Sequence, residues 1–232
     1  MTGDDVDGDA LPLFPLGTVL LPGAALPLHV FEQRYRQLTV DLITRVVPGK
    51  QFGVIAMREG WTADDDGMAG MHEVGCTALL RDVRRLPDGR YDIVTRGATR
   101  FRLLELDTES KPYLTGRVEW LPDVEPAPVS EEALAELVAA ARDAHRRYCA
   151  TAWQQGDWRE PDEGITPDTL PHVLAADCLL PVADRQRLLE QTSPSRRLRM
   201  VRAMLAREAG MLGQLRAVPA PMTTFAVEHS VN

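Results

Sequence analysis

The segment PDVEPAPVS, residues 122–130, constrains the fold more than any other stretch, because the pattern of apolar residues changes across it. Its prolines can continue neither a helix nor the middle of a sheet. Before it, short apolar runs separated by turn residues predict β-strands. After it, apolar residues recur at helical spacing. We therefore predict a β-rich domain at 11–124 and an α-helical bundle domain at 125–214.

The β-rich half is expected to be antiparallel or mixed, since no long helices separate its strands. The dipeptide Asp88-Gly89 predicts a tight hairpin turn. One amphipathic helix is predicted at 31–46, with Phe31 and Tyr35 one turn apart and packed together on the sheet. Beyond the opening of the chain, the predicted strands are residues 51–58, 75–86, 90–97, 99–106 and 113–121.

Three helices of the second half have a recognisable start. Ser130 can cap a helix that runs to about Ala152. Thr166-Pro167 and Ser193-Pro194 each combine a capping residue with a proline, which suits the first helical position. The fold class is therefore α+β, with a small helical bundle after the sheet.

Bulk properties bound the function. The net charge of −8 lacks the positive excess that phosphate-backbone binding usually requires, so a nucleic-acid partner is not expected. Three isolated cysteines fit a reducing compartment. No apolar run is long enough to span a bilayer. We expect a cytoplasmic protein without membrane contact, with a disordered acidic tail at 1–10 and a loose C-terminal tail at 215–232.

The opening stretch LPLFPLGTVLLPGAALPLHVFEQRYRQL, residues 11–38, resembles the start of the Lon protease N-terminal (substrate-binding) domain family. The prolines break this apolar run into two short strands before the predicted helix. Further blocks that resemble the family follow in the same order along residues 11–212. They are Phe52-Gly53-Val54, Val74-Gly75-Cys76, Asp88-Gly89-Arg90, Gly97 with Arg100-Phe101, Pro112-Tyr113-Leu114 and the helical residues 179–198.

This resemblance implies a PUA-like β pseudo-barrel with an embedded helix, followed by an α-helical bundle. It also implies a role in recognising substrates for ATP-dependent proteolysis. The sequence contains no P-loop of the form G-x-x-x-x-G-K-[ST], and its Ser110-Lys111 pair has no bearing on a Ser-Lys protease dyad. We therefore expect a free-standing, non-catalytic member without the ATPase and protease domains.

Catalytic, cofactor and metal sites are not predicted. No nucleophile signature surrounds Cys76, Cys149 or Cys178, and their spacing matches no common metal motif. Glu32, Arg34, Tyr35 and Arg100 are interpreted as residues that determine the fold. For binding polypeptide, the candidates are the tryptophans in polar predicted loops, Trp61, Trp153 and Trp158.

The leading functional hypothesis is a polypeptide-binding module, acting as an adaptor or holdase for unfolded or degron-bearing proteins, with a Lon-type protease as a further partner. Two alternatives stay open. One is an RNA-binding PUA-like protein, and the other is a small-molecule sensor that uses a cleft between the domains. The RNA alternative rests on the arginines Arg81, Arg84, Arg85, Arg96, Arg100 and Arg102. The sequence does not define an oligomeric state.

Overall fold

The structure is a computed structural model that describes residues 9–58, 60, 67–154 and 157–215. The chain divides into two compact units. The first, which we call the β unit, comprises residues 1–124 and 181–192. The second, which we call the helical unit, comprises residues 125–180 and 193–232.

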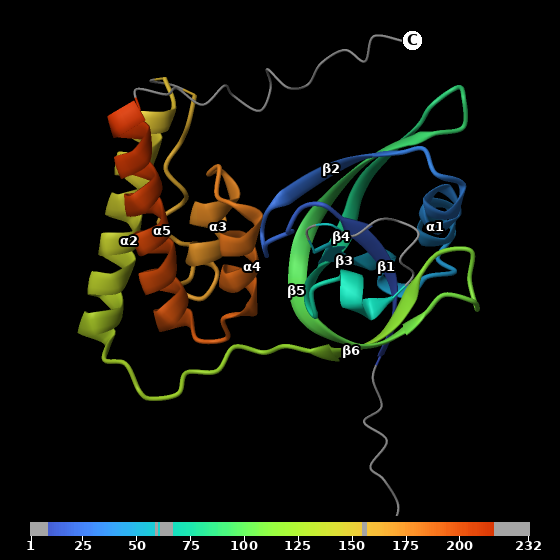
Figure 1. Cartoon of the computed structure of the whole chain (residues 1–232), viewed down its shortest axis with the longest axis horizontal. Coiled ribbons are helices and arrows are strands. Elements are labelled where there is room, and N and C mark those ends of the chain that lie inside the picture. The colour runs from blue at the N-terminus through green and yellow to red at the C-terminus, as the bar shows by residue number, and fades with distance from the viewer. Residues whose placement is uncertain (1–8, 59, 61–66, 155–156, 216–232) are drawn as a thin grey trace, which may run out of the picture. The chain divides into compact units, whose positions relative to one another are not determined.

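The β unit is built on a sheet with the strand order β2-β5-β4-β3-β1-β6. β5 also pairs with β6, so five of the strands close into a barrel while β2 extends from the outer side of β5. β1 and β3 pair in parallel, and β5 curves around the barrel as its longest strand (Figure 1). The strands are β1 (Asp9–Leu16), β2 (Ala25–Val30), β3 (Gln51–Ala56), β4 (Val74–Arg85), β5 (Tyr91–Asp107) and β6 (Thr115–Trp120).

This arrangement confirms the predicted α+β class and the β barrel with an embedded helix. The two predicted strands at 90–97 and 99–106 form the single strand β5. The strand stays continuous through a bulge, in which Ala98 and Thr99 of β5 lie opposite the single residue Thr77 of β4. The Thr77 hydroxyl accepts a hydrogen bond of 2.9 Å from the Thr99 N–H. The barrel core consists of Leu11, Leu13, Ile55, Met71, Phe101, Leu103 and Val118.

The embedded helix α1 (Gln33–Ile43) is shorter than predicted, and the expected Phe31–Tyr35 contact is wrong. The Tyr35 ring instead stacks on Phe14 of β1, with ring centroids 3.8 Å apart. Phe31 precedes the helix, so helical spacing does not govern its direction, and it is 62% exposed. Tyr35 thus fixes α1 to the barrel without help from Phe31.

The structure differs from the predicted domain boundaries at residues 181–192, which the sequence placed in the helical bundle. They belong to the β unit and include helix α4 (Val182–Glu190). The Gln186 side chain donates a 3.0 Å hydrogen bond to the Val74 carbonyl of β4. The Val124 N–H donates one of 3.1 Å to the Thr192 carbonyl.

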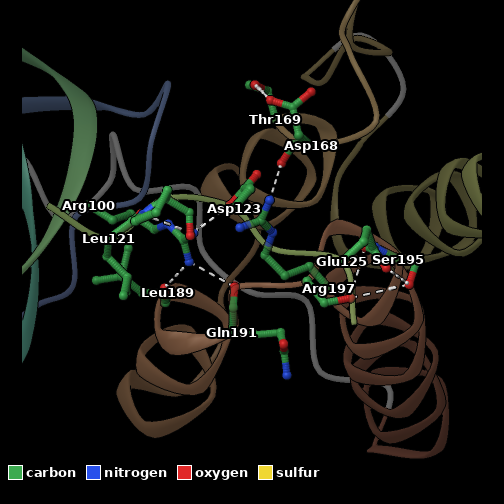
Figure 2. A network of polar contacts seen from close by, with 12 residues as sticks. Arg100, Leu121, Asp123, Glu125, Asp168, Thr169, Leu189, Gln191, Ser195 and Arg197 are labelled. Carbon is green, nitrogen blue, oxygen red and sulfur yellow. Dashed lines mark hydrogen bonds and ion pairs between the residues drawn. The ribbon is translucent and has the colours of Figure 1, made fainter. Parts of the chain in front are cut away.

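Arg100 of β5 also connects to this segment (Figure 2). Its side chain is 4% exposed. The guanidinium donates to the carbonyl oxygens of Leu189 at 2.9 Å and Gln191 at 2.8 Å, and it pairs with the Asp123 carboxylate at 2.5 Å. Arg100 is therefore a residue that determines the fold, in agreement with the sequence interpretation.

The helical unit contains α2 (Glu131–Ala152), α3 (Leu170–Ala176) and α5 (Pro194–Leu215), with α2 and α5 side by side (Figure 1). The predicted caps at Ser130 and Ser193 are confirmed. Their hydroxyl oxygens accept hydrogen bonds of 3.2 Å from Ala133 N–H and Arg196 N–H. The predicted start at Thr166 is wrong, because Thr166 opens a turn that precedes α3.

The start of α5 has a further carboxylate cap. Glu125 accepts hydrogen bonds from the Ser195 N–H at 2.7 Å, the Ser193 hydroxyl at 2.9 Å and the Ser195 hydroxyl at 3.0 Å (Figure 2). Burial by itself would raise the pKa of Glu125, but these hydrogen bonds hold it below its ordinary value of 4.5. The ionised form therefore stabilises the folded helical unit.

We expect Glu125→Gln to lower the free energy of unfolding by about 1 kcal/mol at neutral pH, as for other helix caps. Because the folded pKa is lowered, this contribution is fully present above pH 4.5 and is lost as pH falls through the folded value. Urea denaturation across a pH series should show the two proteins converging in acid. Glu136→Gln, at an exposed position in the second turn of α2, is the control and should change stability by less than about 0.5 kcal/mol. A pH-independent difference for Glu125→Gln would contradict this cap.

The predicted tails extend mostly beyond the described residues. Asp9 and Ala10, which the sequence placed in the acidic tail, are the first residues of β1, and Leu215, which it placed in the C-terminal tail, is the last residue of α5. The remaining tail residues, 1–8 and 216–232, lie outside the described part of the chain. Within the described part, no helix has the length and apolar character needed to cross a membrane.

Candidate functional site

The β unit contains an apolar recess of about 480 Å³. It lies where the first residues of β1 meet the end of β6 and the loop before β3. A volume of this size falls within the range of pockets that hold small ligands or several side chains. The recess is lined by Asp9, Ala10, Leu11, Pro12, Val46, Val47, Pro48, Gly49, Gln51, Lys111, Tyr113, Thr115 and Trp120.

The loop that forms one wall of the recess is held in an unusual backbone conformation. Arg45 and Lys50 have φ angles of 64° and 51°, and Gly49 has a φ of 71°. Positive φ in residues other than glycine costs about 1 kcal/mol or more and persists only where the surroundings impose it. Between these positions, Val47 is buried while Val46 is 61% exposed. The loop thus keeps an apolar side chain in solvent at the recess.

Trp120, at the end of β6, forms another part of the wall and is 37% exposed. Its indole Nε1–H donates a 2.7 Å hydrogen bond to the Asp9 carboxylate on the neighbouring strand β1. This bond satisfies the polar atom of the ring and orients its apolar face. The result is a fixed aromatic surface that stays accessible to a ligand.

Tyr113 contributes a rigid, buried part of the lining. Its hydroxyl donates a 2.7 Å hydrogen bond to Asp41 of α1, whose other carboxylate oxygen accepts from Gln37. Burial, together with the Asp41 carboxylate, raises the pKa of Tyr113 well above its usual range. Tyr113 is therefore neutral at physiological pH, and its hydrogen bond to Asp41 holds it in place as part of the recess wall.

A second cavity of the β unit, about 560 Å³, is polar and lies beside α4. His72 lies in it, 4.0 Å from the Glu190 carboxylate. Burial and the positive charge of Arg58 lower the pKa of His72, so the imidazole is neutral at pH 7. The lining also includes Glu73, Val74, Arg102, Ala183, Gln186 and Arg187.

Comparison with known proteins identifies the family. The family model described as the ATP-dependent protease La (LON) substrate-binding domain matches residues 10–207. The chain belongs to the Lon substrate-binding domain family. The resemblance seen in the sequence is thereby confirmed, and every residue that lines the apolar recess except Asp9 lies within the matched residues.

Relatives include full-length proteases. The Lon protease of Anaeromyxobacter dehalogenans is 33% identical over 210 residues, which are 87% of this chain and 24% of that protease. Lon protease 2 of Myxococcus xanthus is 32% identical over 210 residues, which are also 87% of this chain and 24% of that protease. The chain thus spans about a quarter of the length of these curated relatives, and the region it matches is the substrate-binding part.

Solved structures of Lon N-terminal domains have the same fold. The Lon N-terminal domain protein from Xanthomonas campestris gives a TM-score of 0.61 at 26% identity and covers 84% of this chain and 98% of its own. The N-terminal domain of the Mycobacterium avium complex Lon protease gives 0.60 at 17% identity, covering 85% and 98%, which supports the fold alone.

The predicted tryptophan site and the recess of this Lon-family chain involve different residues. Trp61 lies outside the described residues. Trp153 follows α2 and is half-buried, and Trp158 is half-buried with its ring edge-on to His145. The lining of the recess includes Trp120. Sequence reasoning missed Trp120 because it sits at the end of a predicted strand.

Three of the six arginines that support the RNA alternative are buried or lie beside a carboxylate. Arg100 is buried, Arg84 pairs with Asp92 at 2.5 Å, and Arg102 lies 3.8 Å from Glu119. These carboxylates offset the positive charge that phosphates would need. Arg81, Arg85 and Arg96 are exposed, so the RNA alternative for this Lon-family chain rests on these three side chains.

Proposed function

We propose that this chain is a non-catalytic polypeptide-binding module that holds apolar side chains of unfolded or degron-bearing proteins in the recess of the β unit. The observation that carries the proposal is the accessible apolar recess formed by Trp120, Val46 and their neighbours. Membership in a family of substrate-binding domains supports a polypeptide as the occupant. An adaptor or holdase role beside a Lon-type protease belongs to the same proposal.

The free side of β2 is a weaker candidate for holding a polypeptide. An added strand would need backbone N–H groups along β2, but Pro27 lacks one. His29, near the end of β2, carries a side chain that pairs with Asp92 and introduces a polar group. Proline and charged groups are common devices against strand addition. Side-chain capture in the recess therefore explains binding better than strand addition.

The test is the affinity for a permanently unfolded probe, reduced and carboxymethylated α-lactalbumin, measured by fluorescence anisotropy. We expect Val46→Asp to raise the Kd about tenfold or more, because a charge replaces a valine whose burial is worth about 1.5 kcal/mol or more. Val124→Asp is the matched control. Val124 is 56% exposed in the same unit and does not line the recess, so its substitution should leave the Kd unchanged.

Equal affinity of wild type and Val46→Asp would contradict the recess as the site. A Trp153→Ala/Trp158→Ala double variant tests the tryptophans predicted from the sequence. If only this variant loses binding, the site lies on the helical unit. If wild type binds neither this probe nor a degron peptide, the polypeptide-binding function itself is refuted.

A further inference from the structure

The helical unit brings together three side chains of types that commonly bind metal ions. They lie far along the sequence from the residues that line the recess. His145 and Cys149 lie on α2, and Cys178 follows the end of α3. Each of the three residues is only 1% exposed. Their candidate ligand atoms all lie within 4.8 Å of one another. This cluster combines two soft sulfur ligands with one imidazole.

The local fold explains why these side chains converge. His145 and Cys149 are four residues apart, so they occupy one face of α2. Tyr148 lies on the same face of α2, and its hydroxyl accepts a 2.9 Å hydrogen bond from the Leu179 N–H. Because Leu179 follows Cys178 directly, this bond fixes the position of the Cys178 backbone beside α2. Trp158 covers the His145 ring edge-on, with ring centroids 6.1 Å apart.

The distance between the two ligand atoms on α2 suits tetrahedral coordination. Zn²⁺ binds cysteine sulfur at about 2.3 Å and histidine nitrogen at about 2.0–2.1 Å, so ligand atoms at neighbouring tetrahedral corners lie about 3.5–3.8 Å apart. The Cys149 Sγ lies 3.5 Å from His145 Nε2. Two thiolates and one imidazole are also a ligand set that selects thiophilic metals over Mg²⁺ or Ca²⁺.

The surroundings favour the form of cysteine that binds metal. The hydrogen bond from Cys178 and the interactions with His145 lower the pKa of Cys149, although burial opposes them. Cys76 of the β unit provides the contrast, since burial raises the pKa of its thiol to about 12. Only the thiolate is a metal ligand. The assignment of a metal site rests on the convergence of the three ligand atoms, and the lowered pKa of Cys149 is consistent with it.

We propose that His145, Cys149 and Cys178 bind a single thiophilic metal ion such as Zn²⁺, with a water molecule or another small donor at the fourth position. The ion links α2 to the segment after α3 and stabilises the helical unit. This site is independent of the apolar recess and of polypeptide binding. It also departs from the sequence expectation of no metal site.

The experiment uses the full chain, reduced and stripped of metal with a chelator, and titrated with Zn²⁺ against a chromophoric competitor. Co²⁺ serves as the second probe, because its thiolate-to-metal charge-transfer absorption reports sulfur ligation directly. We expect one equivalent of Zn²⁺ per chain, a two-thiolate Co²⁺ spectrum and a higher melting temperature with metal. Cys149→Ser, Cys178→Ser and His145→Ala should each weaken Zn²⁺ binding about 100-fold or more.

Cys76→Ser is the matched control, since it removes an equally buried cysteine in the β unit and should leave metal binding unchanged. Circular dichroism of each variant separates loss of ligation from loss of folding. If a ligand variant fails to fold, the Co²⁺ spectrum of wild type still decides, because absence of the thiolate band refutes the site. Unchanged binding in the folded serine variants also overturns the proposal. A Cys149–Cys178 disulfide that persists under reductant overturns it too, because it would consume both sulfur ligands.

Discussion

Replacing Arg100 with methionine is expected to lower the free energy of unfolding of the β unit by about 3–5 kcal/mol. The buried guanidinium is the donor for the carbonyl oxygens of Leu189 and Gln191 and the partner of the Asp123 carboxylate. Methionine fills a similar volume but donates no hydrogen bond. The variant would leave two carbonyls and a partly buried carboxylate without this donor, and such losses are among the most destabilising single changes.

Denaturant unfolding would measure the total loss, and hydrogen exchange would localise it. We expect faster exchange in β4, β5 and α4, whose connection depends on Arg100. Arg102→Met is the matched control on the same strand. Arg102 is 47% exposed and lies 3.8 Å from Glu119, so its removal should cost at most about 1 kcal/mol. Similar losses of stability in the two variants would show that the buried contacts of Arg100 contribute no more to the β unit than an exposed arginine does.

Local signals in the sequence predicted those parts of the fold that depend on neighbouring residues. The hairpin between β4 and β5 turns at Asp88-Gly89, where Gly89 has a φ of 81°. Ser130 and Ser193 cap helices through atoms only three residues away. Such features are encoded within one turn of chain, so pattern reasoning identified them correctly.

Features that depend on distant pairs were not accessible in this way. The Arg100 guanidinium donates hydrogen bonds to carbonyls 89 and 91 residues further along the chain, and these two bonds connect the end of α4 to β5. Phe31 shows a related difficulty, because its spacing to Tyr35 has meaning only if both residues are in the helix. The helix begins at Gln33, and Phe14 takes the place beside Tyr35.

The candidate sites combine both kinds of information. The spacing of His145 and Cys149 places them on one helix face and is readable from the sequence. Cys178 has no local signal that connects it to them, so a three-ligand cluster could not be predicted. The recess likewise assembles the ends of β1 and β6 with the loop at 45–50. Trp120 looked like an ordinary strand residue in the sequence, so it was not singled out, and a binding role for the tryptophans in polar loops stays a prediction.

Replacing Gly97 with alanine is the second large effect expected, a loss of about 3 kcal/mol in the free energy of unfolding of the β unit. At this point of β5 the loop before β2 crosses closely. The Gly97 N–H donates to the Ala24 carbonyl at 2.8 Å, and the Gly97 carbonyl accepts from the Gly23 N–H at 2.9 Å. An added Cβ would collide with the backbone carbonyl group of Leu21. A backbone group cannot rotate away as a flexible side chain can, so the loop must lift and both hydrogen bonds must lengthen.

Urea denaturation and the melting temperature would measure this loss, and hydrogen exchange at β2 and at residues 19–24 would show whether the loop is the part that moves. Gly17→Ala provides the matched control in the same connection between β1 and β2. No atom lies within 4 Å of a Cβ added at Gly17, so alanine there should change stability by no more than about 0.5 kcal/mol. Equal stability of the two variants would mean that the crossing at Gly97 yields without cost. A loss confined to Gly97→Ala would instead assign the requirement for glycine to close backbone approach, because neither position needs a positive φ.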